Sequence, residues 1–160
     1  MAAAGSTPLM SSADRTLSTQ GMSITCPDGW RDASMLILSA TAPSPSGITP
    51  NLVITREPLP DPETADRVAR LQDFVDRQID QMHTALKDFR EVAHRRATAE
   101  RPGVALTIEW TSNGIPVTQA ITYAYADART VVISTATASQ SEFPQAEPQF
   151  LALLRSFRMG

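Results

Sequence analysis

One long β-hairpin is predicted for residues 103–125, which read Gly-Val-Ala-Leu-Thr-Ile-Glu-Trp-Thr-Ser-Asn-Gly-Ile-Pro-Val-Thr-Gln-Ala-Ile-Thr-Tyr-Ala-Tyr. Asn113-Gly114 is typical of a two-residue type I′ turn, because both central positions of that turn need a positive φ, which Asn and Gly adopt at least cost. This turn sets a register in which the residues of one face pair as follows: Trp110 with Val117, Ile108 with Gln119, Leu106 with Ile121, and Val104 with Tyr123. All of them except Gln119 are apolar or aromatic, so this face is expected to pack in the core.

Gln119 interrupts the apolar face of the predicted hairpin. A buried amide costs stability unless both its donor and its acceptor are bonded. Two interpretations therefore stay open. Gln119 is a core amide bonded within its own protein, or it lines a groove and bonds a group that arrives from another molecule.

Length and composition are those of an ordinary soluble domain. The chain has 160 residues, of which 42% are hydrophobic and 19% charged, and a net charge of −3. This charge argues against nucleic-acid binding, which needs a concentrated basic surface. The single cysteine, Cys26, allows no intrachain disulfide and favours a reducing compartment. The N-terminus lacks a basic start, a sustained apolar run and a lipobox, so we expect a cytoplasmic protein without a signal peptide or membrane span.

The N-terminal half is predicted to contain a tail, three strands and a long helix. Residues 1–18 have no hydrophobic period and predict a flexible tail, followed by a single domain over residues 19–160. Strands are expected at residues 22–26, 33–41 and 51–56. The second is uniformly apolar, which indicates a central strand with both faces covered or a strand that presents one face to a partner. Asp61-Pro62 is expected to open the long helix.

The long helix carries one apolar stripe, formed by Val68, Leu71, Val75, Ile79, Met82 and Leu86. Gln78 flanks this stripe, where a glutamine is either solvated or available to a ligand. After the helix, strands are expected at residues 90–99, in the central hairpin and at residues 130–138, and a short helix ends the chain. This order has no βαβ repeat. It predicts an α+β fold, an antiparallel sheet of about six to seven strands with one long and one short helix packed on it.

No catalytic or metal-binding arrangement stands out in the sequence. Asp80 and His83 lie one helical turn apart, which is more typical of a solvated helix face than of a metal site. Cys26 alternates with Met22 and Ile24, as a small buried hydrophobe does, although the sequence does not exclude a pairing with a histidine. Glycine-rich phosphate loops are absent. We therefore expect a protein that is not an enzyme and needs no cofactor or metal.

Four segments resemble the DcrB-related family, and most closely its Eag branch of effector-associated chaperones of bacterial type VI secretion. They are Pro27-Asp-Gly-Trp-Arg-Asp-Ala-Ser34, Asn51-Leu-Val-Ile-Thr-Arg56, Arg77-Gln-Ile79 and Val117-Thr-Gln-Ala-Ile121. The resemblance covers residues from about 20 to 158. It implies a PsbP-like fold and a homodimeric cytoplasmic chaperone. Such chaperones hold the N-terminal transmembrane helices of a secreted toxin, often an Rhs effector, in an apolar groove until the toxin is loaded on the secretion apparatus.

The resemblance also implies binding residues. The two glutamines with which the family bonds the effector match Gln78 and Gln119. Around them we expect an apolar lining, for which ordinary core packing is the alternative at each position: Met35, Ile37, Val53, Ile108, Val117 and Ile121. The effector would link the protein indirectly to the secretion spike, and the protein itself would not insert into a membrane. The alternative within the family is an envelope-associated binding protein of the DcrB type, which the missing signal and lipobox disfavour.

Overall fold

The computed structural model describes residues 15–60 and 66–160, which form two compact units divided between Ser34 and Met35. The first unit is a hairpin of β1 (Arg15–Thr19) and β2 (Met22–Cys26), joined by Gln20 and Gly21 with positive φ. The strand expected at residues 22–26 is thus confirmed, but it pairs with β1 in a sheet of its own. Residues 15–18 lie in β1 rather than in a tail, and residues 1–14 lie outside the described chain.

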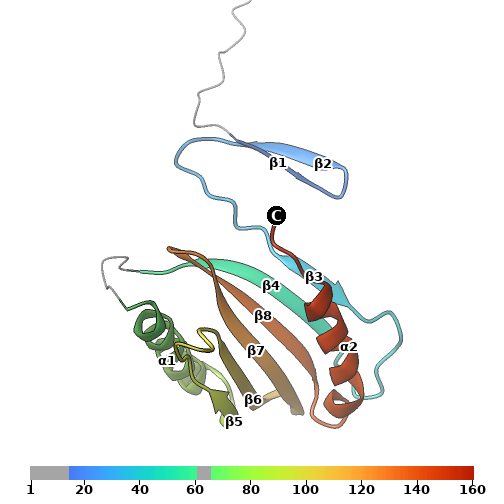
Figure 1. Cartoon of the computed structure of the whole chain (residues 1–160). Coiled ribbons are helices and arrows are strands. Elements are labelled where there is room, and N and C mark those ends of the chain that lie inside the picture. Colours follow the sequence, from blue (N-terminus) through green and yellow to red (C-terminus); the bar gives the residue numbers. More distant parts are fainter. Residues whose placement is uncertain (1–14, 61–65) are drawn as a thin grey trace, which may run out of the picture. The chain divides into compact units, whose positions relative to one another are not determined.

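The second unit is a six-stranded antiparallel sheet with two helices (Figure 1). Its elements are β3 (Leu36–Ser39), β4 (Asn51–Pro58), α1 (Arg67–Ala85), β5 (Arg90–Arg95), β6 (Val104–Ser112), β7 (Ile115–Asp127), β8 (Thr130–Ser139) and α2 (Phe143–Ser156). The strand order is β3-β4-β8-β7-β6-β5. The predicted α+β class, with a long and a short helix on an antiparallel sheet, is confirmed.

The central hairpin forms with the predicted register. Its strands β6 and β7 pair Trp110 with Val117, Ile108 with Gln119, Leu106 with Ile121 and Val104 with Tyr123. Asn113 and Gly114 have φ values of 50° and 81°, as a type I′ turn requires. The turn therefore selects which side chains of this hairpin face the core.

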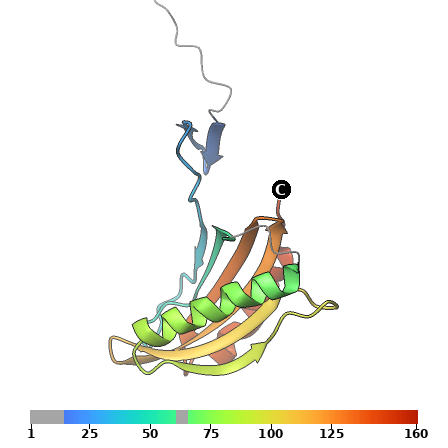
Figure 2. The same ribbon diagram turned by 90° about the vertical axis from the view of Figure 1, so that its left-hand side faces the viewer.

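The two helices lie on opposite faces of the sheet, as Figure 2 shows with α1 in front and α2 behind. On the α1 face, Leu71 and Val75 of the helix pack with buried residues of β6, β7 and β8. On the other face, Phe143, Ala146 and Phe150 of α2 pack with residues of β4 and β8. The sheet thus separates two hydrophobic clusters. Strand β8 supplies buried residues to both clusters, Val131 and Ile133 to one and Val132 and Ala136 to the other, as the period of two along a strand dictates.

Two predicted elements differ from the structure. The helix begins at Arg67, because the Asp66 carboxylate caps it by accepting hydrogen bonds from the backbone N–H groups of Val68 and Ala69. Asp61 and Pro62, the expected start, lie outside the described residues. The apolar run at residues 33–41 contains only the short strand β3, which lies at the sheet edge with all four residues exposed. Of the two alternatives for this run, the central strand with both faces covered is wrong, and the strand that presents a face to a partner stays a prediction.

A carboxylate at the start of α2 holds the loop between β3 and β4. Glu142 accepts hydrogen bonds from the hydroxyl groups of Ser139, at 2.6 Å, and Ser44, at 2.7 Å, and also from that of Ser46. The hydroxyl groups of Ser139, Ser46 and Ser44, in decreasing order of effect, lower the pKa of Glu142 below its usual value. This contact ties residues far apart in sequence, and it positions the loop that leads out of the edge strand.

Gly114→Ala is expected to destabilise the protein by about 1–2 kcal/mol, because an alanine at φ 81° places its Cβ against the following carbonyl. Urea denaturation followed by circular dichroism measures the loss. Gly160→Ala, at the C-terminal residue where an added Cβ contacts nothing, is the control and should leave stability unchanged. An unchanged midpoint for Gly114→Ala would show that this turn does not set the hairpin.

Glu142→Gln is expected to lower the melting temperature at pH 7, and the difference from the parent should narrow in acid. The pKa of Glu142 is lower in the folded protein than in the unfolded chain, where a glutamate titrates at about 4.3. The stabilisation by this carboxylate is therefore present above that pH and is lost as the pH falls through the folded-state pKa. Calorimetry at pH 7 and pH 3 measures both effects. Glu147→Gln, at an exposed carboxylate of the same helix, should change neither value, and an equal loss at both pH values for Glu142→Gln would contradict this assignment.

Candidate functional site

Part of the α1 face of the sheet is left uncovered by the helix. The cross-strand register aligns Ile37 of β3 with Val53 of β4, Val53 with Thr135 of β8, and Thr137 of β8 with Gln119 of β7. Thr135 also pairs with Ile121, which packs in the cluster beneath α1, so these residues share the α1 face. Ile37 is exposed and the other four are half-buried. We call this set, Ile37, Val53, Gln119, Thr135 and Thr137, the open strip.

The open strip lies beside the helix because α1 covers the other half of the same face. The buried residues that pack with α1 come from β6, β7 and the first part of β8. The strip combines the branched apolar side chains of Ile37 on β3 and Val53 on β4 with the hydroxyl groups of two threonines on β8, Thr135 and Thr137. This is a surface on which an apolar partner can lie while its polar groups find hydrogen bonds.

The Gln119 amide is bonded on both sides at the boundary between core and open strip. Trp110 Nε1–H donates to Gln119 Oε1 at 3.0 Å, and Gln119 Nε2 donates to Thr137 Oγ1 at 2.9 Å. The side chain thus satisfies one donor and one acceptor internally, as the first of the two sequence interpretations requires. An amide has a second N–H and a second acceptor lone pair. At a half-buried position these remain chemically able to bond a partner.

Gln78, on α1, contacts the same face of the sheet at Tyr123 of β7. The hydroxyl of Tyr123 donates to Gln78 Oε1 at 3.3 Å, and burial raises the pKa of Tyr123 to about 12, so this hydroxyl keeps its proton. Gln78 Nε2 donates no hydrogen bond to any of residues 15–60 and 66–160. Gln78 also lines an open hollow of about 250 Å³ on α1, together with Gln81, Met82, Ala85 and Leu86.

The residues expected to line a groove divide into two groups. Met35 and Ile37 are 54% and 56% exposed, and Val53 is half-buried beside Ile37, so these three are accessible. Ile108, Val117 and Ile121 are only 0%, 1% and 5% exposed and belong to the core. Ordinary core packing, the alternative to lining a groove, therefore describes these three residues.

Sequence reasoning missed four residues that shape this surface: Thr135, Thr137, Trp110 and Tyr123. The two threonines lie on β8, and their position beside β4 and β7 depends on strand pairing between distant segments, for which the sequence carries no local signal. Trp110 and Tyr123 were placed on the correct face by the hairpin register. Trp110 pairs across the ladder with Val117, and Gln119 follows two residues later on the same face of β7. This diagonal spacing could have suggested the hydrogen bond between Trp110 and Gln119.

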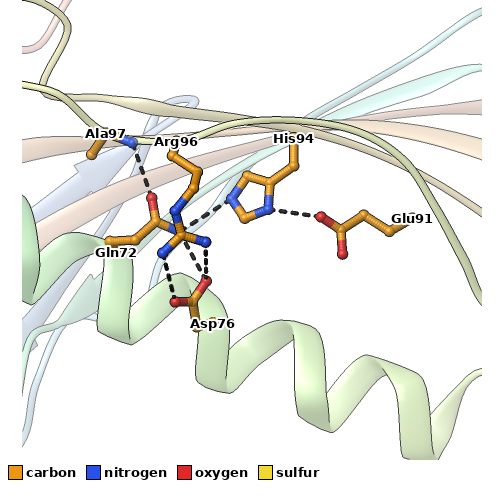
Figure 3. Close-up of polar contacts among 6 residues, drawn as sticks. All are labelled: Gln72, Asp76, Glu91, His94, Arg96 and Ala97. Atoms are coloured by element: carbon orange, nitrogen blue, oxygen red, sulfur yellow. Dashed lines mark hydrogen bonds and ion pairs between the residues drawn. The ribbon is translucent and has the colours of Figure 1, made fainter.

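Gln72 anchors α1 to β5 and to the segment that follows it, at the edge of the sheet opposite β3 (Figure 3). Gln72 is buried, and its Oε1 accepts a hydrogen bond from the backbone N–H of Ala97 at 2.9 Å. Its Nε2 lies 2.9 Å from Asp76 Oδ1 and 3.1 Å from His94 Nε2. Since the amide nitrogen donates, His94 Nε2 accepts, and the proton of the ring lies on Nδ1, which donates to Glu91 at 2.7 Å.

Arg96 completes this anchor by pairing with Asp76 at 3.1 Å. Burial alone would raise the pKa of Asp76, but hydrogen bonds from Gln72 and Arg96, with the positive charge of Arg96, outweigh burial and lower it. Asp76 therefore stays ionised near neutral pH. The anchor ties α1 to the β5 side of the sheet, so that the helix packs on β6 and β7 and leaves the β3–β4 side of the face uncovered.

The residues weighed for catalysis have structural contacts. The thiol of Cys26 is buried and donates to the backbone carbonyl of Trp30 at 3.5 Å. His83 packs edge-on against Phe89, with ring centroids 5.5 Å apart. Within the part of the chain that the structure describes, three or more metal-ligating side chains do not come together, and neither helix is long and apolar enough to cross a membrane.

Gln119→Ala is expected to cost about 1–2 kcal/mol of stability, because it leaves the Trp110 N–H and the Thr137 hydroxyl without their partner. Chemical denaturation measures the loss, and Gln81→Ala, at an exposed glutamine of α1, is the control expected to be neutral. A double-mutant cycle with Trp110→Phe should yield a coupling of about 0.5–1.5 kcal/mol. Additive effects of the two substitutions would contradict the hydrogen bond.

Comparisons with known proteins agree on the fold. A DcrB family model matches residues 22–156, and no curated protein matches the chain. The crystal structure of PA94, a Pseudomonas aeruginosa protein of unknown function, is 21% identical with a TM-score of 0.69, and the match covers 92% of this chain and 97% of that one. At this level of identity, the likeness supports the fold.

Two further solved structures are more distant. LpqN of Mycobacterium tuberculosis, involved in cell envelope biogenesis, is 14% identical with a TM-score of 0.45, over 86% of this chain and 72% of that one. Cyanobacterial PsbP (CyanoP) from Synechocystis sp. PCC 6803 is 11% identical with a TM-score of 0.46, over 100% and 99%. Both TM-scores lie below 0.5, so neither structure adds support for the fold.

Proposed function

The chain belongs to the DcrB family, and from this premise we propose that it is a non-enzymatic chaperone for a type VI secretion effector. It would bind the hydrophobic N-terminal segment of the effector in the cytoplasm, shield its transmembrane helices from water, and help to load the toxin, for example an Rhs protein, on the secretion apparatus. The resemblance of its four sequence segments to Eag chaperones supports this choice within the family.

The open strip is the observation that carries this proposal. A transmembrane helix in water exposes a long apolar surface that aggregates or inserts into a membrane. Ile37 and Val53 offer branched apolar contacts, and Met35 extends them at the edge of the sheet. A helix lying on this surface would be covered by a rigid sheet on one side and flanked by α1, a form of helix-in-groove recognition.

Polar groups beside the apolar contacts match a second need of such a client. Small polar residues in the transmembrane segments of the client need hydrogen-bond partners while they are bound to the chaperone. Gln78 offers an amide N–H without a partner in the described chain, and Thr135 offers a hydroxyl on the open strip. Gln119 would contribute its second N–H while it keeps its bonds to Trp110 and Thr137.

Ile37→Asp is expected to weaken client binding by at least about tenfold, because it places a charge on the apolar contact surface at an exposed position that costs the fold little. The protein is co-expressed with the N-terminal hydrophobic segment of the effector encoded beside it, and the soluble complex is quantified. Leu151→Asp is the matched control. It changes an exposed leucine of α2 on the other face and should leave complex formation unchanged.

Three outcomes would contradict the proposal. The first is a segment that stays insoluble with the parent chaperone. The second is equal capture by the parent and by Ile37→Asp. The third is a loss of capture with Leu151→Asp as large as that with Ile37→Asp, since α2 packs on the opposite face of the sheet.

A further inference from the structure

The orientation of the Gln72 amide is fixed by its three partners (Figure 3). The backbone N–H of Ala97 donates to Gln72 Oε1, so the amide nitrogen must point the other way. Its two N–H groups then serve Asp76 Oδ1 and His94 Nε2. A flipped amide would set its N–H groups against the N–H of Ala97 and its oxygen against the Asp76 carboxylate. His94 must therefore offer a lone pair at Nε2.

His94 is bonded in its neutral form at both ring nitrogens. Nε2 accepts from Gln72, and Nδ1 carries the proton and donates to Glu91 Oε1 at 2.7 Å. The ring lies on the α1 face of β5, because His94 pairs across the ladder with Leu106, which packs beneath α1. Its side chain is only 12% exposed. The neutral ring is thus part of the contact between helix and sheet.

A second proton on His94 would turn one of these bonds into a contact between two donors. Histidine is the side chain that ordinarily takes up a proton between pH 5 and pH 8. An N–H at Nε2 would face the N–H of Gln72, and Gln72 cannot turn its oxygen toward the ring without losing its bond to Ala97. Protonation of His94 and the present position of the Gln72 amide therefore exclude each other.

The carboxylates around the ring offer the charged form another partner. Glu91 on β5 already accepts from Nδ1, and Asp76 on α1 accepts from the same amide nitrogen that bonds His94. The pKa of Asp76 lies below its usual value, so this carboxylate is ionised wherever a histidine titrates. Arg96 pairs with Asp76 and opposes the new charge, and the residue of β6 opposite the ring is apolar. A charged His94 can thus bond Asp76 in place of Gln72.

We propose that the contact between Gln72 and His94 is a proton-dependent switch that sets the position of α1 beside the open strip, an inference that rests on the proposed function. With His94 neutral, Gln72 ties the helix to β5 and to the segment that follows it. With His94 charged, the amide leaves both His94 and Ala97, and the helix keeps only the contact through Asp76. These are two discrete arrangements of one element, which a switch requires.

The other contacts of α1 specify its position less sharply than these hydrogen bonds do. Leu71 and Val75 pack on the core of the sheet, and apolar packing is not directional. The uncovered part of the same face, with Ile37 and Val53, lies on the side away from the anchor. A helix without the Gln72 bonds moves toward this apolar surface and covers part of it. Acid should therefore weaken client binding.

The protein by itself tests the switch. Nitrogen-15 spectra of the imidazole at pH 8 should show the His94 proton on Nδ1 and none on Nε2. Hydrogen exchange at the Ala97 N–H, corrected for the intrinsic rate at each pH, should lose protection at least about fivefold between pH 8 and pH 5, because the bond to Gln72 is lost. The N–H of Thr111, which donates to the carbonyl of Lys87, is the internal control and should stay protected.

Three variants connect this response to the two residues. His94→Gln keeps an acceptor for the Gln72 N–H but takes up no proton, so Ala97 should stay protected at both pH values. His83→Gln, the matched control, removes the second of the two histidines and should respond to pH as the parent does. Gln72→Met keeps the volume but removes the amide, so Ala97 should be equally unprotected at both pH values.

Binding of the hydrophobic effector segment tests the link to the client. Its affinity should fall at least about fivefold from pH 8 to pH 5 for the parent and for His83→Gln, and should stay constant for His94→Gln. A proton on Nε2 at pH 8, Ala97 protection that does not change with pH in the parent, or a response that persists in His94→Gln would overturn the switch. A switch without any change in client affinity would overturn its control of the open strip. A segment that binds at neither pH refutes the chaperone role alone, since the exchange measurements need no client.

Discussion

The registration of β6 against β7 is the constraint on which the rest of the second unit depends. The side chains of a strand alternate between faces, so a slip of one residue at the Asn113-Gly114 turn would move every core residue of the hairpin to the opposite face. The observed register places Leu106, Ile108, Ile121 and Tyr123 together beneath α1. It also places Gln119 between Trp110 and Thr137, where its amide finds a partner on each side.

Each helix covers only part of one face of the sheet, and the part of the α1 face that stays uncovered is the candidate site. The anchor of Gln72, Asp76 and Arg96 holds α1 over the β5–β6 side of one face, and α2 packs against β4 and β8 on the other. Ile37, Val53 and Thr135 on the α1 face are therefore left partly exposed. Gln72 is the buried member of this anchor, and a buried amide is costly unless it is bonded, so the anchor also specifies one position for the helix.

Accessible apolar surface is the feature that supports the carrier role proposed for this member of the DcrB family. Ordinary domains expose apolar residues singly, whereas here Met35, Leu36, Ile37 and Leu38 are consecutive and exposed at a sheet edge. A client that lies on the α1 face would contact the side chains of this segment that project on that face, such as Ile37.

Local patterns in the sequence determined most of the elements and the hairpin register, because turn chemistry and a period of two or 3.6 act over a few residues. They also singled out Gln78 and Gln119 as polar interruptions beside apolar stripes. Only the tertiary structure decided that β3 lies at an edge, that β1 and β2 form a separate hairpin, and that Ile108, Val117 and Ile121 are core while Ile37 and Val53 are accessible. An apolar strand has the same sequence pattern whether a helix covers it or not. Which strands are covered follows from pairing between distant segments and from where each helix is anchored, and these depend on the whole chain at once.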